Sequence, residues 1–409
     1  MDTPSVLIAL AAIVIVSYLF NLLSKKTRIP SVLMLLALGI LLKLGANAAE
    51  FPDPDVRPLL EVLGSVGLIM IVLEAALDLE LTRENRNMIG KSLLITIVEL
   101  TATTAFLAAV FHIGFDAPLQ NAIIYAVPLA ILSSAIIIPS VEHLSHNIKE
   151  FMIYQSTFSD ILGIMLFYFL VEGFSEQAGA AEWALQFGWS FGVSMVISAV
   201  FAYLLVLLLK NIKTELKLFL LISVLILLYA VGKQLHLSSL LIILIFGLIL
   251  NNPKLFFFGP LRPWLKMDII EGLLEDFRLI TRETAFIVRT FFFVVFGYSL
   301  ELASLADPLV IFYAAISLVG IYRVRGTILV WSFKDKQSLI YSMAPRGLIT
   351  ILLFYNIPES FAIAAFDNGI LLYIILATSV YMAWGMVRSR AKEDGDHGTI
   401  RDVIEEMNR

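Results

Sequence analysis

The stretch "KEFMIYQSTFSDILGIMLFYFLVE" (residues 149–172) contains an apolar run that is long enough to cross a lipid bilayer as a helix. Asp160 falls near the middle of this run. A carboxylate at that depth costs about 2.5–3.5 kcal/mol on insertion scales, and such residues usually face a pathway or a partner inside the protein. The stretch therefore predicts a membrane-embedded helical fold and a functional site at Asp160.

The composition of the whole chain agrees with this interpretation. The 409 residues are 59% hydrophobic and 15% charged, whereas soluble domains are typically about 45–50% apolar and about 25% charged. The net charge of −5 is modest, and no basic face indicates binding to nucleic acid. The chain has no cysteine, which excludes disulfides, thiol catalysis and thiolate metal sites. We expect an all-α polytopic membrane protein and no enzyme.

Polar residues divide the chain into about thirteen predicted transmembrane helices. The predicted spans are residues 4–23, 30–45, 59–80, 89–112, 119–142, 149–172, 186–209, 215–232, 236–250, 281–302, 308–330, 336–357 and 366–388. Most Lys and Arg residues outside the spans lie in alternate loops, and the opposite loops hold only Lys43, Arg57 and Lys233. The positive-inside rule then places the N-terminus outside and the C-terminus in the cytoplasm.

The spans group into two predicted halves. Residues 1–250 should form the first inverted repeat, a linker span and the start of the second repeat, and residues 281–388 should complete the second repeat. Between them, residues 251–280 are amphipathic and predict a helix at the cytoplasmic interface. The tail, residues 389–409, is too short for a nucleotide-binding regulatory domain.

An internal similarity supports the inverted repeats. "MIVLEAALDLEL" (70–81) resembles "FFVVFGYSLEL" (292–302), although the two segments cross the membrane in opposite directions. Each precedes a span that Pro, Gly or Ser interrupts near its middle, at residues 126–141 and 341–353. This pattern is typical of transporters whose two broken helices cross at a central binding site.

Polar side chains gather around Asp160 and in the first interrupted span. One helical face of span 6 supplies an amide, two hydroxyls and a carboxylate, and the break in span 5 adds two serines and freed backbone carbonyls. These oxygen atoms suit a hard cation. The predicted cation- and proton-binding residues are Gln155, Ser156, Ser159, Asp160, Ser133 and Ser134, with Asp160 and Ser156 as ligands of the metal cation. For Ser133 and Ser134, close helix packing by small residues is an open alternative.

Buried charges need partners, and we expect Asp160 to pair with Arg323. Arg289 should pair with Glu283 or Glu99, although these three residues could equally serve only to lock helices together. Arg325 lies close to a cytoplasmic end and can reach the membrane surface by snorkelling, and Arg346 can do the same if span 12 is broken there. A carboxylate that holds either a proton or a cation would explain exchange of the two.

Four segments resemble motifs of the monovalent cation:proton antiporter superfamily, the sodium/hydrogen exchanger family. These are "TRIPSVLMLLALGILL" (27–42), "MIVLEAALDLEL", "FFFVVFGYSLEL" (291–302) and "PRGLITILL" (345–353). "QSTFSD" (155–160) also lies on the family's E-S-x-x-N-D pattern. The resemblance implies Asp160 as proton and cation carrier, Ser156 as ligand, and Arg323 and Arg346 as charge-compensating residues.

The chain is a divergent member by this resemblance. Gln155 and Ser159 replace the family's Glu and Asn, and Ser133, Ser134 and Ala135 replace its T-D-P. One carboxylate with one counter-arginine favours electroneutral exchange.

We expect antiport of H⁺ against Na⁺, with Li⁺ or K⁺ as alternatives, through elevator-like movement of a core of spans 4–6 and 11–13. The resemblance also implies a homodimer in the bacterial inner membrane, a role in pH homeostasis and no cofactor. A sodium-coupled organic-anion symporter and a transport-inactive membrane sensor or scaffold stay open as alternatives.

Overall fold

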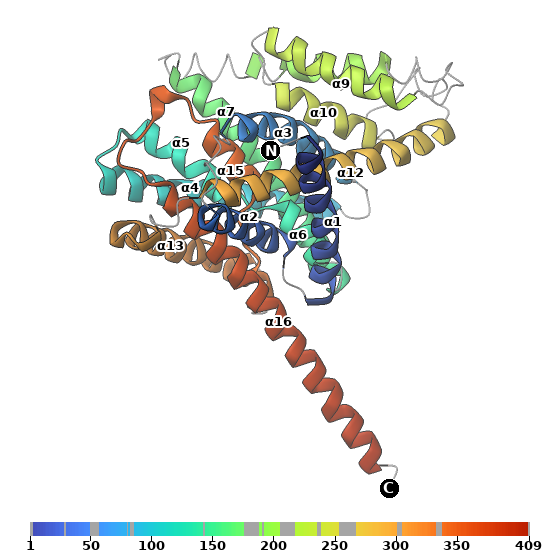
Figure 1. The fold of residues 1–409 in the computed structure, drawn as a ribbon. Helices are drawn as coiled ribbons and strands as arrows, with labels where there is room; N and C mark the ends of the chain where they lie inside the picture. Colours follow the sequence, from blue (N-terminus) through green and yellow to red (C-terminus); the bar gives the residue numbers. More distant parts are fainter. Residues whose placement is uncertain are drawn as a thin grey trace.

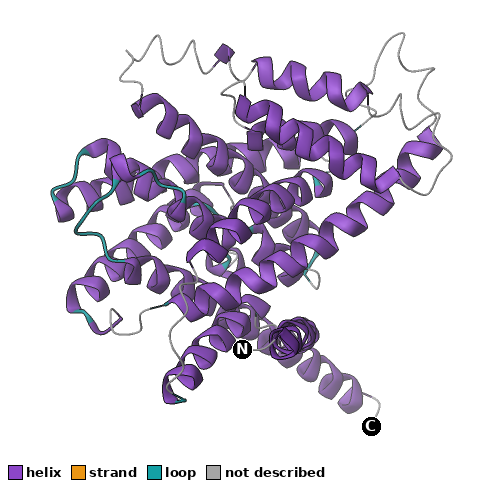
Figure 2. Cartoon of the chain, turned by 45° about the horizontal axis from the view of Figure 1, so that its top comes forward, coloured by secondary structure: helices purple, strands orange, loops and turns teal. Residues whose placement is uncertain are grey.

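The structure is a computed structural model that describes residues 3–27, 30–49, 57–79, 81, 86–141, 144–175, 188–189, 192–204, 217–234, 239–252, 267–300, 305–332 and 338–407. Within these ranges the regular elements are helices, and no strand is present (Figure 2). The all-α prediction is therefore confirmed for the described part of the chain.

The helices follow the predicted spans in order (Figure 1). Their bounds are α1 Thr3–Thr27, α2 Ser31–Ala48, α3 Arg57–Asp78, α4 Arg86–Phe115, α5 Leu119–Ala130, α6 Ser134–Ser140, α7 His146–Ser175, α9 Lys217–Gln234, α10 Ser239–Asn251, α12 Met267–Ser299, α13 Pro308–Ser332, α14 Ser338–Ser342, α15 Leu348–Tyr355, the 3-10 helix η3 Glu359–Phe361 and α16 Asn368–Met407. The predicted seventh span, residues 186–209, lies partly outside the described residues. The last helix, α16, projects from the helical body (Figure 1).

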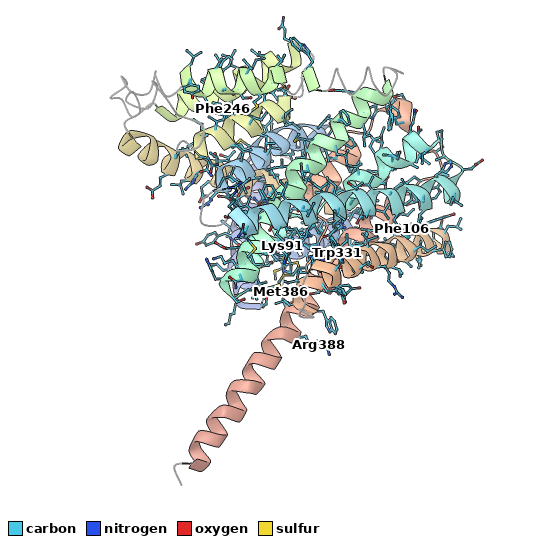
Figure 3. The ribbon with its side chains drawn as sticks, turned by 180° about the vertical axis from the view of Figure 1, so that it is seen from behind. Lys91, Phe106, Phe246, Trp331, Met386 and Arg388 are labelled. Atoms are coloured by element: carbon cyan, nitrogen blue, oxygen red, sulfur yellow. The ribbon has the colours of Figure 1, made fainter. Side chains whose placement is uncertain are left out.

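The outer surface of this body is apolar. In the described part of the chain, six helices are long and apolar enough to cross a membrane when α5 and α6 are counted together. Large apolar side chains stand out on the surface of several of them, including Ile113 at 80% exposure and Trp331 at 81%. Trp331 on α13 and Phe106 on α4 are labelled in the view from behind (Figure 3). Large apolar side chains exposed in this number are unfavourable in water, and helices of this length and hydropathy fit a bilayer, so the chain is an integral membrane protein.

The second half of the predicted linker differs from the expectation. Residues 267–299 form a single continuous helix, α12, so that the boundary expected at residue 280 falls inside it. The charged residues before position 283 lower the hydropathy of this segment, but they do not favour ending a helix. Most of the first half of the linker lies outside the described residues, and the division into 1–250 and 281–388 stays a prediction.

The helices pack as two groups. In the first group α12 packs on α2 and α3, and α3 packs on α10, with α1 against α2 and α9 against α10. The second group contains α4–α7 and α13–α16, which correspond to the predicted spans 4–6 and 11–13. Helix α3 contacts both α7 and α15, so that the two groups meet along it.

The contact between α2 and α12 depends on two glycines. A Cβ atom at Gly39 would lie 2.8 Å from Tyr298 N and 2.9 Å from Gly297 Cα, and closer still to Val294 O. All three are backbone atoms, which cannot rotate away as a side chain can. Gly45, two turns further along α2, has no atom within 4 Å of its Cβ position.

We therefore expect Gly39→Ala to destabilise the protein by about 1–3 kcal/mol through overpacking. Gly45→Ala on the same helix is the matched control, and it should leave stability unchanged or raise it by up to about 1 kcal/mol through helix propensity. Thermal unfolding of the purified variants in detergent measures both effects. Equal midpoints for the two variants would contradict the close approach of α2 and α12.

Candidate functional site

Two helices are broken in the middle of the second group, and their breaks touch. Helix α5 ends at Ala130 and α6 begins at Ser134, while the second break spans residues 343–347 between α14 and α15. Ser133 N donates a hydrogen bond to Pro345 O at 3.0 Å, which joins the two breaks. A Cβ atom at Gly347 would clash with the Ser133 side chain, so the crossing requires glycine there. The prediction of two crossed broken helices is confirmed.

Asp160 on α7 lies beside this crossing. Its side chain is buried, with 1% of the residue exposed. The Oδ2 atom accepts a hydrogen bond from Ser134 N, at the start of α6, at 3.2 Å. The Oδ1 atom is buried and has no hydrogen-bond partner among the described residues. One oxygen of the carboxylate thus holds the break, and the other keeps its lone pairs for a proton or a cation.

The two serines before Asp160 make different contacts. Ser159 Oγ accepts a hydrogen bond from Leu132 N at 2.9 Å, so it satisfies a backbone N–H that the break leaves without a helical partner. Ser156 Oγ instead donates to Ile153 O of its own helix at 3.2 Å. On the predicted polar face of span 6, Ser159 therefore binds the break in the first interrupted helix, whereas Ser156 binds the backbone of α7 itself. The assignment of Ser156 as a cation ligand stays a prediction.

Arg346 lies at the crossing and is fully buried. Its Nε donates to Leu129 O at 2.7 Å, and its NH1 donates to Ala344 O at 2.9 Å. These carbonyls are at the end of α5 and just after α14, where helix ends carry partial negative charge. The position fits a charge-compensating residue, whereas the expectation that Arg346 reaches the membrane surface is wrong.

The expected pairing of Asp160 with Arg323 is not formed. Arg323 is exposed, and the buried arginine of α13 is Arg325, at 0% exposure. Arg325 NH1 donates to both carboxylate oxygens of Glu99, at 2.8 and 3.0 Å, so the snorkelling expected for Arg325 is wrong as well. Residues two apart on a helix point about 200° apart, and only one of these two arginines can face inward.

Gln155 extends this buried pair to α7. Its Nε2 donates to Glu99 Oε2 at 2.8 Å, which leaves only the amide oxygen without a partner among the described residues. Arg325 also donates to Ile340 O from Nε and NH2, at 3.1 and 2.8 Å. The polar network thus ties α4, α7, α13 and α14 together. The sequence pattern missed it, because hydropathy shows that Glu99 and Arg325 lie within spans but not which spans are neighbours.

A cleft of about 420 Å³ reaches the break from one side. Ser134 and Ala135 form part of its lining, and its other walls come from α1, α2, α3 and α12. Five charged side chains line it: Glu74, Asp78, Arg282, Glu283 and Arg289. Arg289 pairs with Glu74 at 2.7 Å, so the expected pairing of Arg289 with Glu283 or Glu99 is wrong.

The packing directly beside Asp160 is apolar. A cavity of about 10 Å³ there is walled by side chains of α3, α7, α10 and α15, including Val72, Ile164 and Leu244. Such a volume holds at most about one water molecule. Asp160 lines this small cavity, whereas Ser134, to which Asp160 is hydrogen-bonded, lines the cleft, and Ala75 of α3 lines both.

A cation at Asp160 would depend on this carboxylate together with hydroxyl and backbone oxygens. Within the described ranges, no group of three or more His, Asp or Glu side chains could hold a metal ion. Two hydroxyls and several backbone oxygens lie at the break, which suits weak binding of a monovalent ion better than tight binding of a divalent one.

Comparisons with known proteins agree with this architecture. Residues 9–386 match a family model described as sodium/hydrogen exchanger, transmembrane. The structure is similar to that of the sodium proton antiporter MjNhaP1 from Methanocaldococcus jannaschii at pH 8, with 19% identity, coverage of 95% of this chain and 99% of that one, and a TM-score of 0.69. A three-dimensional electron-microscopy map of MjNhaP1 gives 18% identity, 97% coverage of each chain and a TM-score of 0.64. No curated protein matches the chain.

Proposed function

The chain belongs to the sodium/hydrogen exchanger family, and from this premise we propose that it exchanges a monovalent cation for protons across the membrane with Asp160 as the carrier. The observation that carries the proposal is the buried carboxylate at the crossing of the two broken helices, with one oxygen bound to Ser134 N and the other without a partner among the described residues. The solved relative of similar fold is itself a sodium proton antiporter. Na⁺ is the first candidate, with Li⁺ or K⁺ as alternatives.

The mechanism follows from the cost of a buried charge. An ionised Asp160 without a counter-ion is unfavourable in this apolar environment, and binding either a proton or a cation neutralises it. If only the neutral forms allow the helix group containing α4–α7 and α13–α16 to slide along α3, one ion must return for each ion carried out. Competition between the two ions for one carboxylate then produces antiport.

One carrier carboxylate supports electroneutral 1:1 exchange. Among the described residues of the second group, Glu99 is also a buried carboxylate, and it accepts hydrogen bonds from Arg325 and Gln155, so that Arg325 balances its charge. Arg346 keeps its contacts with backbone carbonyls whichever ion is bound. Only the charge of Asp160 changes during the cycle, and the cation and the proton compensate it equally.

Transport by the purified protein in proteoliposomes tests this proposal. A pulse of Na⁺, Li⁺ or K⁺ should change the signal of an internal pH-sensitive dye, whereas choline should not. During the Na⁺ and Li⁺ pulses, symmetrical K⁺ with valinomycin clamps the membrane potential, and the rate should be the same with and without the clamp. No response to any of the three cations would refute exchange, and a rate that follows the potential would refute electroneutrality.

Two structural observations bear on the alternatives. A symporter for organic anions would want a free cationic group in the cleft, but both cleft arginines are paired, Arg289 with Glu74 and Arg282 with Asp78. The loss of the family's Glu, Asn and Asp at positions 155, 159 and 134 motivates the alternative of a transport-inactive sensor. The charge of Arg325 is nevertheless balanced, because Glu99 supplies a carboxylate from a neighbouring helix.

The cleft side of Asp160 corresponds to one side of the membrane. Three helices line the cleft near ends whose adjoining loops in the sequence are rich in Lys and Arg: α1 with Asn21, α2 with Ser31 and α3 with Asp78. By the positive-inside rule we assign this side to the cytoplasm, with the N-terminus outside and the tail inside. A homodimer in the bacterial inner membrane and a role in pH homeostasis complete the proposal, and both rest on the family resemblance.

A further inference from the structure

Two ion pairs join α3 to α12 within the cleft. The inner pair is Glu74 with Arg289, at 2.7 Å, and the outer pair is Asp78 with Arg282, at 2.6 Å. The inner side chains are 20% and 17% exposed, while Arg282 of the outer pair is 58% exposed. The chain thus repeats one type of contact at two depths of the same cleft.

The two pairs differ in their relation to Asp160. Ala75, the neighbour of Glu74 on α3, lines both the cleft and the small cavity at Asp160. Ser134, whose N–H binds Asp160, lines the same cleft as the inner pair. The inner pair, the less exposed of the two, therefore shares the cleft with a residue that binds Asp160.

The inner pair also belongs to the other helix group. Glu74 and Arg289 are on α3 and α12, whereas Asp160 is on α7. Movement of one group along the other would change the distance from Asp160 to both charges. An ion that reaches Asp160 from the cleft side of the membrane would then be close to these two charges, whereas an ion that reaches it from the opposite side of the membrane would not.

We propose that the Glu74–Arg289 pair determines the cation affinity of Asp160 on the cleft side, with Glu74 raising the affinity and Arg289 lowering it. The inference rests on the proposed function, because it assumes that Asp160 binds the cation. Glu74 and Arg289 act on the ion through space and through Asp160, so they adjust its affinity and are not carriers.

The other charged groups near the pair are few. Asp78 lies one turn along α3, and Arg282 and Glu283 come from α12. Among the described residues that line the cleft, those of α1, α2 and α6 are uncharged, and Tyr18 and Asn21 are the polar side chains of α1. The inner pair is held by one hydrogen bond, from Arg289 NH2 to Glu74 Oε2. Each charge can consequently be removed while the other stays in place.

Opposite shifts in affinity are the expected result. Coulomb's law with an effective dielectric constant of about 20 makes a unit charge within about 10 Å worth roughly a factor of ten in affinity. Glu74→Gln should raise the dissociation constant for Na⁺ about tenfold, and Arg289→Gln should lower it about tenfold. Calorimetry on the purified protein at the alkaline end of its working range measures these constants with little competition from protons. Li⁺ and K⁺ replace Na⁺ as the probe if Na⁺ does not bind.

Two sets of variants separate this electrostatic effect from a structural one. The double variant Glu74→Gln/Arg289→Gln removes both charges and should return the constant to within about threefold of the wild type. Asp78→Asn and Arg282→Gln remove the outer pair and should each change it by less than about twofold. A structural clamp would instead weaken binding in both single variants of the inner pair, and that result would overturn the inference. Equal shifts from the outer pair would overturn it too.

The outcome also distinguishes this inference from the proposed function. In one outcome the wild type binds a cation, and the two inner-pair variants shift its dissociation constant in opposite directions, while the wild type exchanges nothing in proteoliposomes. That result would support the inference and refute antiport. Binding that neither inner-pair variant alters would refute the inference alone. Wild-type protein that binds none of the three cations would refute both.

Discussion

Asp160→Asn is expected to abolish cation-driven proton movement, with a fall in rate of at least about 100-fold. The amide is nearly isosteric with the carboxylate, and its oxygen can still accept the hydrogen bond from Ser134 N. The fold should therefore be retained, since a neutral amide also costs less to bury than a carboxylate. What the variant loses is the ability to take up a proton or to neutralise a cation.

Everted membrane vesicles with an external pH-sensitive dye give the measurement, and Asp78, a carboxylate that lines the cleft, gives the control. Asp78 is paired with Arg282 at the outer part of the cleft, and Asp78→Asn should keep the exchange rate within about twofold of the wild type. Na⁺ should raise the unfolding temperature of the wild type but not that of Asp160→Asn, because only a bound ion stabilises the folded state. Exchange by Asp160→Asn at the wild-type rate would show that the carrier lies elsewhere.

The sequence predicts the arrangement of the broken helices well, for a local reason. Pro345 and Gly347 lie in the second break itself, whereas Pro128 and Pro139 lie inside α5 and α6, a few residues on either side of the first break at residues 131–133. Proline removes a helical hydrogen bond and so marks the neighbourhood in which a helix breaks. This effect acts on the residues next to the proline, so that a break can be placed without knowledge of the tertiary structure. Asp160 is found equally directly, because a lone acidic residue in an apolar span is costly to bury and therefore indicates a functional site.

The partners of the buried charges could not be predicted in the same way. Arg323 and Arg325 sit in the same apolar helix, and hydropathy gives no reason to prefer one as the buried residue. Which of them faces inward depends on how α13 is rotated against α4, which is a property of packing between distant segments. Gln155 illustrates the same limit, because its amide binds Glu99 on a helix more than 50 residues earlier in the chain.

The length of α12 shows a different limit of the sequence pattern. Charged residues between Met267 and Glu283 lower the hydropathy and indicate an interfacial segment, yet the helix continues to Ser299. Membrane solvation and helix formation depend on different properties of the side chain, and several charged residues are good helix formers. A change in hydropathy therefore predicts where a span leaves the apolar core but not where its helix ends.

Loss of either member of the Glu99–Arg325 pair should cost about 3–5 kcal/mol of folding free energy, the largest stability effect expected in this chain. Arg325 is at 0% exposure and Glu99 at 3%, and removing one leaves an uncompensated charge among apolar helices. Arg325→Met and Glu99→Gln are the two single variants. Chemical unfolding in detergent gives their stabilities, and Arg282→Met is the control, where loss of a pair with an exposed arginine should cost less than about 1 kcal/mol.

The double variant Glu99→Gln/Arg325→Met decides how this loss arises. If it recovers much of the stability that either single variant loses, the cost comes from the charge left behind, because a buried ion pair and an apolar replacement of similar volume are often nearly equal in stability. Additive losses would instead mean that the contacts of Arg325 with Ile340 O hold α13 to α14 independently of Glu99. In the first case the network also explains the amide at position 155. Gln155 donates to a carboxylate that is already balanced by Arg325, whereas a glutamate there would place a second negative charge against Glu99 with one arginine for both.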